Sequence, residues 1–356
     1  MSVVKANLEV LPGGLKVALL LAAAALVALP FAGNDFYTQM VARMMVMAIF
    51  AMSFDLLQGV TGLVSQGHAA FFGMGGYALA FLTASIDSVS LWWSLPLVAV
   101  SMAALAALIG GLVIRTTGIY FIMVTLAISQ MIFHVFFDNK ALGGSDGLYI
   151  NIRPTSSLFG WVPFDLESRT TIYYLVLVVM LLVYVFLRRL LWSPFGRALA
   201  GIRVNEHRMK AIGFNTARYK LAAFTLGGGL AGIAGYLYGA LNGMVSPELI
   251  GFHMSALVLM MVVLGGSGNF AGAIVGAFAF ELMLFAFKSA PQVGSVSLDK
   301  YWQLWMGLSI VLLISFAPRG VLGMVESLVH RWRQRARRAA APQAAAVPGL
   351  AERSNG

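Results

Sequence analysis

The stretch from Ile172 to Leu187 reads IYYLVLVVMLLVYVFL, and none of its sixteen residues is charged. A helix rises 1.5 Å per residue, so about twenty apolar residues cross a hydrocarbon core about 30 Å thick. Comparable runs recur along the chain, for example Tyr301 to Ala317 (YWQLWMGLSIVLLISFA). Transmembrane barrels show short alternating segments instead, so these runs predict spanning helices and an all-α membrane protein.

Composition supports a membrane protein and excludes several other classes. Hydrophobic residues make up 60% of the 356 residues and charged residues only 11%, whereas soluble domains average about 25% charged. The net charge of +10 comes from basic residues between and after the apolar runs, which argues against nucleic-acid binding. With no cysteine, disulfides, thiolate metal sites and cysteine nucleophiles are excluded.

The apolar runs predict about ten membrane segments. Glycines interrupt the third and the eighth, so whether these two span the membrane or re-enter it stays open. The segments are expected at 15–32, 40–58, 66–84, 91–114, 116–137, 171–190, 219–241, 254–266, 269–288 and 302–318.

Basic residues predict the orientation, because cytoplasmic loops collect Lys and Arg. The link after the sixth segment and its two flanks, from Arg188 to Lys220, carry eight basic residues against one acid, Glu206, and the tail carries six arginines. Both regions are therefore expected in the cytoplasm. Six segments precede the link and four follow it, so the N-terminus is expected on the same side.

This orientation divides the chain into five parts. Residues 1–14 are expected to form a cytoplasmic N-terminus, 15–191 six transmembrane helices and 192–218 a cytoplasmic link. Residues 219–320 are expected to form four more transmembrane helices. The remainder, 321–356, has too little apolar surface to fold alone and is expected to be a largely disordered cytoplasmic tail whose arginines contact anionic lipid.

The link at 192–218 has the pattern of two short helices. Ser193 is expected to cap a helix that starts at Pro194, and Asn205 to cap a second helix with Glu206 in its first turn. Gly213 is expected to end the second helix. A rigid element that docks on a motor subunit would explain this order, but a simple topogenic loop remains an alternative.

Within the link, GRALAGIRVNE (196–206) and AIG (211–213) resemble the cytoplasmic coupling region of the permease subunits of high-affinity branched-chain amino acid ABC importers. His207 and Arg208 depart from the general importer motif, which has two alanines there. The resemblance implies ATPase coupling for a set of residues in this link: Gly196, Arg197, Ile202, Arg203, Asn205, Glu206, Ala211 and Gly213.

Three further stretches carry the same resemblance, in the same order, through most of the chain. They are GLVSQGHAAFFGMGGY (62–77), VVLGGSGNFAGAIVGA (262–277) and FAPRGVLG (316–323). The resemblance implies a multi-pass permease of the inner (plasma) membrane. Its implied partners are a second homologous permease, two cytoplasmic ATPase subunits and an external solute-binding protein.

Polar residues inside predicted segments are candidates for the solute route. Intramembrane polar groups are costly and face the bundle interior, so they line a route or bond to another helix. Both readings stay open for the glycine-rich segment, where glycines also permit ordinary tight packing. The candidates are Ser65, Gln66, Gly67, His68 and Glu281. Arg43 and Asp55 are expected to reach toward the two ends of their helix.

The leading prediction is a passive pathway for branched-chain amino acids, driven by the ATPase of a partner. The chain contains no Gly-x-x-x-x-Gly-Lys-Ser/Thr phosphate loop, and neither catalysis, a cofactor nor a metal site is predicted. The resemblance leaves urea, amides and aromatic acids as alternative solutes. An ion-coupled secondary transporter is the alternative of another class, with Asp55 and Glu281 as its only candidate carboxylates.

Overall fold

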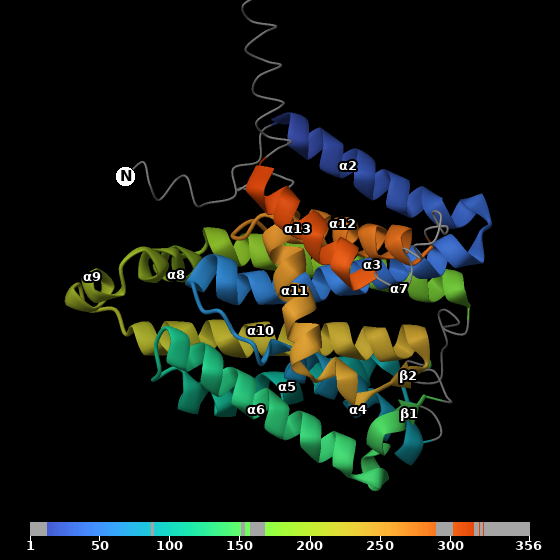
Figure 1. The fold of residues 1–356 in the computed structure, drawn as a ribbon, viewed down its shortest axis with the longest axis horizontal. Helices are drawn as coiled ribbons and strands as arrows, with labels where there is room; N and C mark the ends of the chain where they lie inside the picture. The colour runs from blue at the N-terminus through green and yellow to red at the C-terminus, as the bar shows by residue number, and fades with distance from the viewer. Residues whose placement is uncertain are drawn as a thin grey trace, which may run out of the picture.

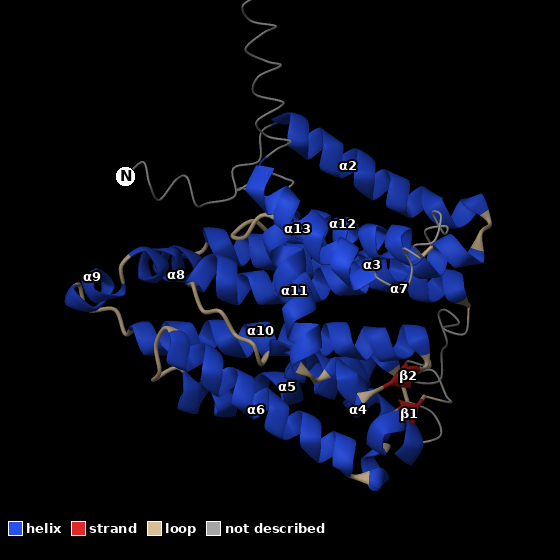
Figure 2. Ribbon diagram, viewed as in Figure 1, coloured by secondary structure: helices blue, strands red, loops and turns tan. Residues whose placement is uncertain are grey.

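The computed structural model describes residues 13–86, 89–150, 154–156, 168–289, 302–316, 320 and 323. Apart from Gly323, the predicted tail at 321–356 lies outside the described residues, as does most of the predicted N-terminus at 1–14. The described part is almost entirely helical (Figure 2). The prediction of an all-α fold is therefore confirmed.

Each of the ten predicted segments contains a helix. In chain order these are α2 (Gly13–Ala28), α3 (Asp35–Asp55), α4 (His68–Ser85), α5 (Leu91–Val113), α6 (Ile119–Asp138), α7 (Arg169–Trp192), α10 (Thr216–Asn242), α11 (Phe252–Gly265), α12 (Phe270–Lys288) and α13 (Trp302–Phe316). Two short helices in the link follow α7, namely α8 (Pro194–Val204) and α9 (Glu206–Ala211).

Shorter elements connect these helices. A π-helical turn, η2 (Leu56–Thr61), extends α3. The 3-10 turns are η1 (Leu29–Ala32), η3 (Lys140–Leu142), η4 (Gly144–Asp146) and η5 (Pro247–Leu249). Two short antiparallel strands, β1 (Leu148–Tyr149) and β2 (Met244–Val245), pair at the end of the molecule opposite α8 and α9 (Figure 2).

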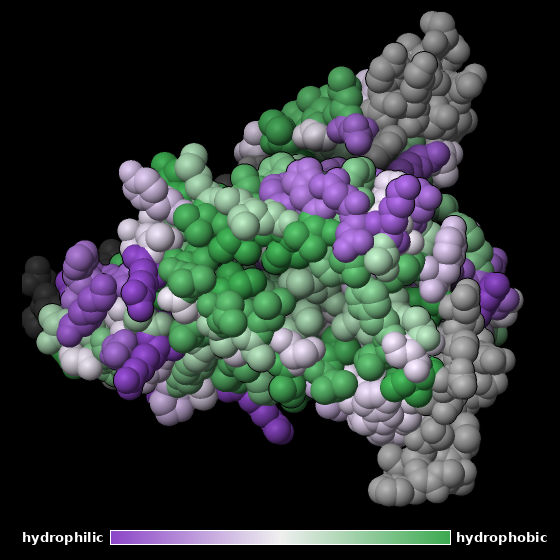
Figure 3. Space-filling view, turned by 90° about the horizontal axis from the view of Figure 1, so that it is seen from below, coloured by the Kyte–Doolittle hydropathy of each residue, from purple (hydrophilic) through white to green (hydrophobic). Residues whose placement is uncertain are grey.

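Six helices of the described residues are long and apolar enough to cross a membrane: α3 with its π-helical extension, α5, α6, α7, α10 and α12. The protein is therefore a multi-pass membrane protein. Figure 3 shows one face with a broad apolar band, and hydrophilic side chains gather at the left end, where α8 and α9 lie in Figure 1.

Two helices, α3 and α10, form the centre of the bundle (Figure 1). On one side α10 packs against α4 and α5, and α6 lies beyond α4. On the other side α3 packs against α7, α11 and α12. Of the six spans, α3 is the most buried, because neighbours cover it on every side. Movements of α3 would therefore reach most of the bundle.

The eighth predicted segment, α11, is a short helix that begins inside the bundle. Its fourteen residues are about 21 Å long, less than a hydrocarbon core of about 30 Å. The hydroxyl of Ser129, midway along α6, donates to the carbonyl of Ile250 at 2.9 Å just before α11 starts. The connection from α10 thus enters the bundle to half its depth, where protein covers its irregular backbone.

Glycines set the distance between α4 and α10. A Cβ added to Gly235 would lie 1.7 Å from the carbonyl oxygen of Phe72, and one on Gly75 would lie 2.3 Å from the carbonyl oxygen of Gly232. Such contacts are forbidden, so only glycine permits this approach. Without a hydrophobic driving force between helices in lipid, close van der Waals packing through small residues stabilises their association.

We expect Gly235→Leu to destabilise the bundle by more than about 3 kcal/mol, because the side chain would collide with the backbone of α4. Gly111→Leu is the matched control, since Gly111 is exposed on α5 and a Cβ added there would meet nothing within 4 Å. Thermal unfolding of the purified proteins in detergent measures the difference. Equal melting temperatures for the two variants would contradict the close approach of α4 and α10.

Candidate functional site

The link at 192–218 leaves α7 through a sharp turn. The hydroxyl of Ser193 accepts a hydrogen bond from the Gly196 amide at 3.3 Å and so caps α8, whose first residue is Pro194. A Cβ on Gly196 would lie 2.4 Å from the carbonyl oxygen of Leu190, so the turn requires glycine. Gly196, Leu199 and Ile202 are buried against the bundle, while Arg197 is exposed.

The second short helix has the caps that the sequence predicted. The side-chain oxygen of Asn205 accepts from the amide of Arg208 at 2.9 Å at the start of α9. Gly213 lies just after the end of α9 and has φ +90°, a left-handed conformation that residues with a side chain rarely adopt. Asn215 then caps α10 by accepting from the amide of Arg218 at 3.2 Å. Local hydrogen bonds therefore fix each corner of the link.

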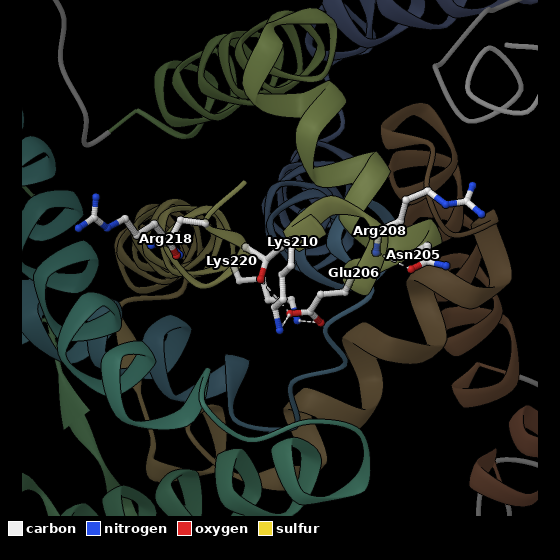
Figure 4. A network of polar contacts seen from close by, with 8 residues as sticks. Asn205, Glu206, Arg208, Lys210, Arg218 and Lys220 are labelled. Carbon is white, nitrogen blue, oxygen red and sulfur yellow. Dashed lines mark hydrogen bonds and ion pairs between the residues drawn. The ribbon is translucent and has the colours of Figure 1, made fainter. Parts of the chain in front are cut away.

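Glu206 joins α9 to α10. One carboxylate oxygen lies 2.6 Å from Nζ of Lys220, and the other lies 3.1 Å from Nζ of Lys210 and accepts from the hydroxyl of Thr216 at 3.0 Å. Lys220 is 8% exposed. Figure 4 shows Lys210 and Lys220 converging on this carboxylate, while Arg208 and Arg218 point away from it.

The contacts of Glu206 change its acidity. Partial burial favours the neutral acid and raises its pKa, but hydrogen bonds from Lys220, Lys210 and Thr216 and the charge of Lys220 outweigh this effect. The pKa of Glu206 falls from 4.5 to about 2. The carboxylate is therefore ionised at physiological pH, so its pair with Lys220 is an ion pair.

Arg203 connects α8 to the C-terminal end of α3. Its guanidinium donates to the carbonyl of Gly59 in the π-helical turn η2. The stem of Arg203 packs on Gly62, with its Cγ 3.3 Å from the Cβ position there. Gly268, in the turn between α11 and α12, lies beside the same guanidinium and the Gly59 carbonyl. One side chain of the link thus contacts three elements of the bundle.

Asp55, the last residue of α3, lies at the same junction. Its carboxylate accepts a hydrogen bond from the Gly268 amide at 2.8 Å, and the residue is fully buried. Asp55 thus lies at the end of its helix, as the sequence predicted, but its side chain is buried and does not extend out of the bundle. The amide of the α11–α12 turn binds the carboxylate and holds it inside the bundle.

The route candidates at 65–68 lie together between η2 and α4, in backbone that is not helical until His68. The Ser53 hydroxyl lies 2.9 Å from Nε2 of His68, whose ring stacks on Phe50 with 5.6 Å between ring centroids. The backbone amide of Gln66 donates to the hydroxyl of Thr125 at 3.2 Å, and Gly67 packs on the backbone of Thr125.

Three side-chain atoms of this segment are buried without a hydrogen-bond partner among the described residues: Oγ of Ser65, Oε1 of Gln66 and Nδ1 of His68. A buried polar atom without a hydrogen-bond partner lowers the stability of the fold, so each one needs an explanation, for example a role in binding. Their assignment to the solute route stays a prediction.

Glu281 is far from these four residues. It is 8% exposed on α12, and its Oε2 lies 3.9 Å from Nε of Arg43 on α3. The cation beside Glu281 comes from a segment far away in the sequence. The two sets of route candidates therefore lie at different places: His68 bonds to Ser53, near the C-terminal end of α3, whereas Glu281 lies beside Arg43, ten residues earlier on the same helix.

The chain matches the family described as the branched-chain amino acid transport system permease component over residues 36–316. It belongs to this family. The match begins in α3 and ends with α13, so it includes the link and both sets of route candidates.

Curated relatives of this permease carry similar descriptions. This chain is 30% identical over 318 residues to the LivM permease protein of the high-affinity branched-chain amino acid transport system of Salmonella typhimurium. The match covers 84% of this chain and 72% of the relative. A probable LivM from Methanocaldococcus jannaschii is 24% identical, covering 74% and 81%. The LivH permease protein of Escherichia coli is 23% identical, covering 78% and 92%. No solved structure matches significantly.

The acidity of Glu206 predicts a pH dependence of stability. Because its pKa is lowered in the folded protein, its stabilising contribution is complete above the unfolded value of 4.5 and is lost as the pH falls toward 2. We expect the difference in melting temperature between wild type and Glu206→Gln to be constant above about pH 5.5 and to shrink below about 4.5. A difference that declines between about pH 6 and 8 would refute the pairing.

Proposed function

We propose that this permease forms the pathway of an ABC importer for branched-chain amino acids and that the link at 192–218 couples it to the ATPase. The observation that carries the proposal is the double attachment of the link. Glu206 ties it to α10 through Lys220, and Arg203 ties it to the inner end of α3. A push on α9 would therefore reach both central helices.

The proposed docking surface lies at the tip of the link. No residue of α9 is buried, and the apolar side chains of Val204 and Ile212 are 58% and 65% exposed. This tip lies at the far end of the bundle in Figure 1, beyond the apolar band, and basic residues surround it. An apolar tip with a basic rim supports docking into a groove of a partner protein over the alternative of a topogenic loop.

The proposed partners follow from the family and from what this chain lacks. The sequence contains no phosphate loop, so two cytoplasmic ATPase subunits are proposed to supply hydrolysis. A second permease completes the pathway, and an external binding protein delivers the solute. The residues proposed to couple are those assigned to the link by resemblance, with Arg203 and Glu206 as the two attachment points.

The proposed location is the inner (plasma) membrane of the cell. In the proposed orientation both termini and the link lie in the cytoplasm. The excess of Lys and Arg in the link supports this orientation. It places the α8 and α9 end of the bundle inside and the end with β1 and β2 outside (Figure 1).

Branched-chain amino acids are the proposed solute because the relatives are described as transporting them. Urea, amides and aromatic acids remain the alternatives within the same architecture. The two carboxylates that an ion-coupled transporter would need have partners in this fold: Asp55 accepts from Gly268, and Glu281 pairs with Arg43.

Replacing Glu206 by Gln and Gly213 by Val together is expected to lower solute-stimulated ATPase activity of the assembled importer at least about tenfold. The first change breaks the tie to α10, and the second places a branched residue at φ +90°. Membrane insertion should not change, because the apolar helices are intact.

A matched double variant, Glu248→Gln with Gly33→Val, makes the same two changes at the opposite end, where Gly33 also has positive φ and open space. This control should retain coupled hydrolysis. If the Glu206 and Gly213 variant hydrolyses ATP at the control rate in response to solute, the link is not the coupling element.

A further inference from the structure

The ends of α3, α10 and α12 opposite the link line a half-open cavity of about 280 Å³. Three charged side chains line it: Arg43 in the third turn of α3, Glu281 about two turns before the end of α12, and Lys288 at that end. Asn242, the last residue of α10, adds an amide. Charged groups of both signs inside a membrane segment mark a functional site by default.

The contact between Arg43 and Glu281 is too long for a hydrogen bond. Nε of Arg43 lies 3.9 Å from Oε2 of Glu281, and the structure gives neither residue a hydrogen bond to another described residue. A guanidinium carries five donors in a planar fork that fits a carboxylate. Arg43 therefore has donors to offer a second anion, while the Glu281 carboxylate has lone pairs to offer a cation.

Apart from Gln39 on α3, the remainder of the cavity is apolar. Met40 on α3 and Leu284 on α12 line it, together with Phe36 and Phe285. The two aromatic rings lie 5.8 Å apart, centroid to centroid, so they pack on one another. The cavity thus combines a charged part built by Arg43, Glu281 and Lys288 with an apolar part contributed by the same two helices.

We propose that this cavity is a binding site for a zwitterionic amino acid with an apolar side chain, on the outer part of the solute route. Arg43 and Lys288 bind the α-carboxylate, Glu281 binds the α-ammonium, and Met40 and Leu284 contact the side chain. Urea and simple amides carry no charge, so they would match neither the guanidinium of Arg43 nor the carboxylate of Glu281.

The Asn242 amide is in place to support the same ligand. Its Nδ2 donates to the carbonyl of Tyr238 at 2.9 Å, which fixes the side chain and leaves its oxygen as an acceptor for an ammonium. A volume of about 280 Å³ lies at the lower limit of small-molecule pockets, about 300 Å³, and suits one amino acid better than a larger solute.

The inference rests on the proposed function, because the orientation places this end of the bundle outside, where a binding protein releases solute. A zwitterionic lipid headgroup, such as phosphatidylethanolamine, shares the ligand chemistry. A purely structural ion pair between Arg43 and Glu281 is the remaining alternative. The experiment below separates these three.

The test uses the complete importer, with both permeases, both ATPase subunits and the binding protein, in lipid nanodiscs. Photo-leucine, a diazirine analogue of leucine, is the probe, and labelled peptides are located by mass spectrometry. We expect labelling of the segments that carry Met40 and Leu284, and competition by excess leucine. Glu281→Gln and Arg43→Gln should each lower this labelling by about tenfold or more, because each removes a charge-assisted contact.

Asp35→Asn is the matched control, since Asp35 lies one turn or less from the cavity but pairs at the exposed surface with Arg169 at 3.2 Å. Its labelling should equal that of wild type. The double variant Arg43→Gln with Glu281→Gln removes both charges of the pair together, so it keeps the test valid if a single variant fails to fold. The proposal predicts that the double variant also stays unlabelled.

Three results would overturn the site. A structural ion pair predicts that the double variant recovers labelling and ATP-driven leucine uptake to the control level. A headgroup site predicts that photo-leucine labelling of these segments is not lowered by excess leucine. Labelling of Glu281→Gln equal to Asp35→Asn would exclude the charge contact itself. Separately, wild-type complex that is labelled but takes up no leucine with ATP would refute the proposed function and leave the site standing.

Discussion

The ion pair between Glu206 and Lys220 is the interaction on which the proposed coupling end of this permease depends. Glu206 begins α9, a helix of only six residues. Isolated helices become even marginally stable only at about twelve to fifteen residues. Lys220 is almost fully buried, and a buried ammonium without a partner costs about 3–5 kcal/mol. The carboxylate thus stabilises the helix and the lysine at once, and the hydroxyl of Thr216 fixes its orientation.

Glu206 fixes α9 on α10, and this also restricts the position of the preceding helix, α8. Arg203, on α8, contacts the π-helical turn that follows α3. A π-turn leaves backbone carbonyls that a regular helix would use, and the guanidinium binds one of them at Gly59. Asp55 and Gly268 extend this junction to the turn before α12. The central helix α3 therefore joins the proposed coupling end to the cavity beside Arg43 at its other end.

Glycine makes this arrangement possible in lipid, where helices associate through close contact. The α4 and α10 helices meet at Gly235 and Gly75, and α11 meets α12 where a Cβ on Gly265 would lie 1.9 Å from the carbonyl oxygen of Gly272. The irregular segments at 62–67 and 243–251 both pack against α6, through Thr125 and Ser129, so protein covers part of their backbone.

Much of the fold could be predicted from the sequence, since run lengths locate helices and local chemistry locates caps. The ten segments and the caps at Ser193 and Asn205 depend only on neighbouring residues. The Arg43–Glu281 pair, the Arg203–Gly59 contact and the entry of α11 at half depth could not be predicted, because distant segments create them. Lys220 looked like one more topogenic charge, and only its burial by folding makes it the partner of Glu206.

The most direct test of the account is the accessibility of the tip of the link. The chain has no cysteine, so Ile212→Cys provides a single reactive thiol. The account predicts that a membrane-impermeant maleimide labels it in inverted membrane vesicles and not in intact cells, and that bound ATPase subunits protect it. Labelling in intact cells, or equal labelling of inverted vesicles with and without the ATPase subunits, would contradict it.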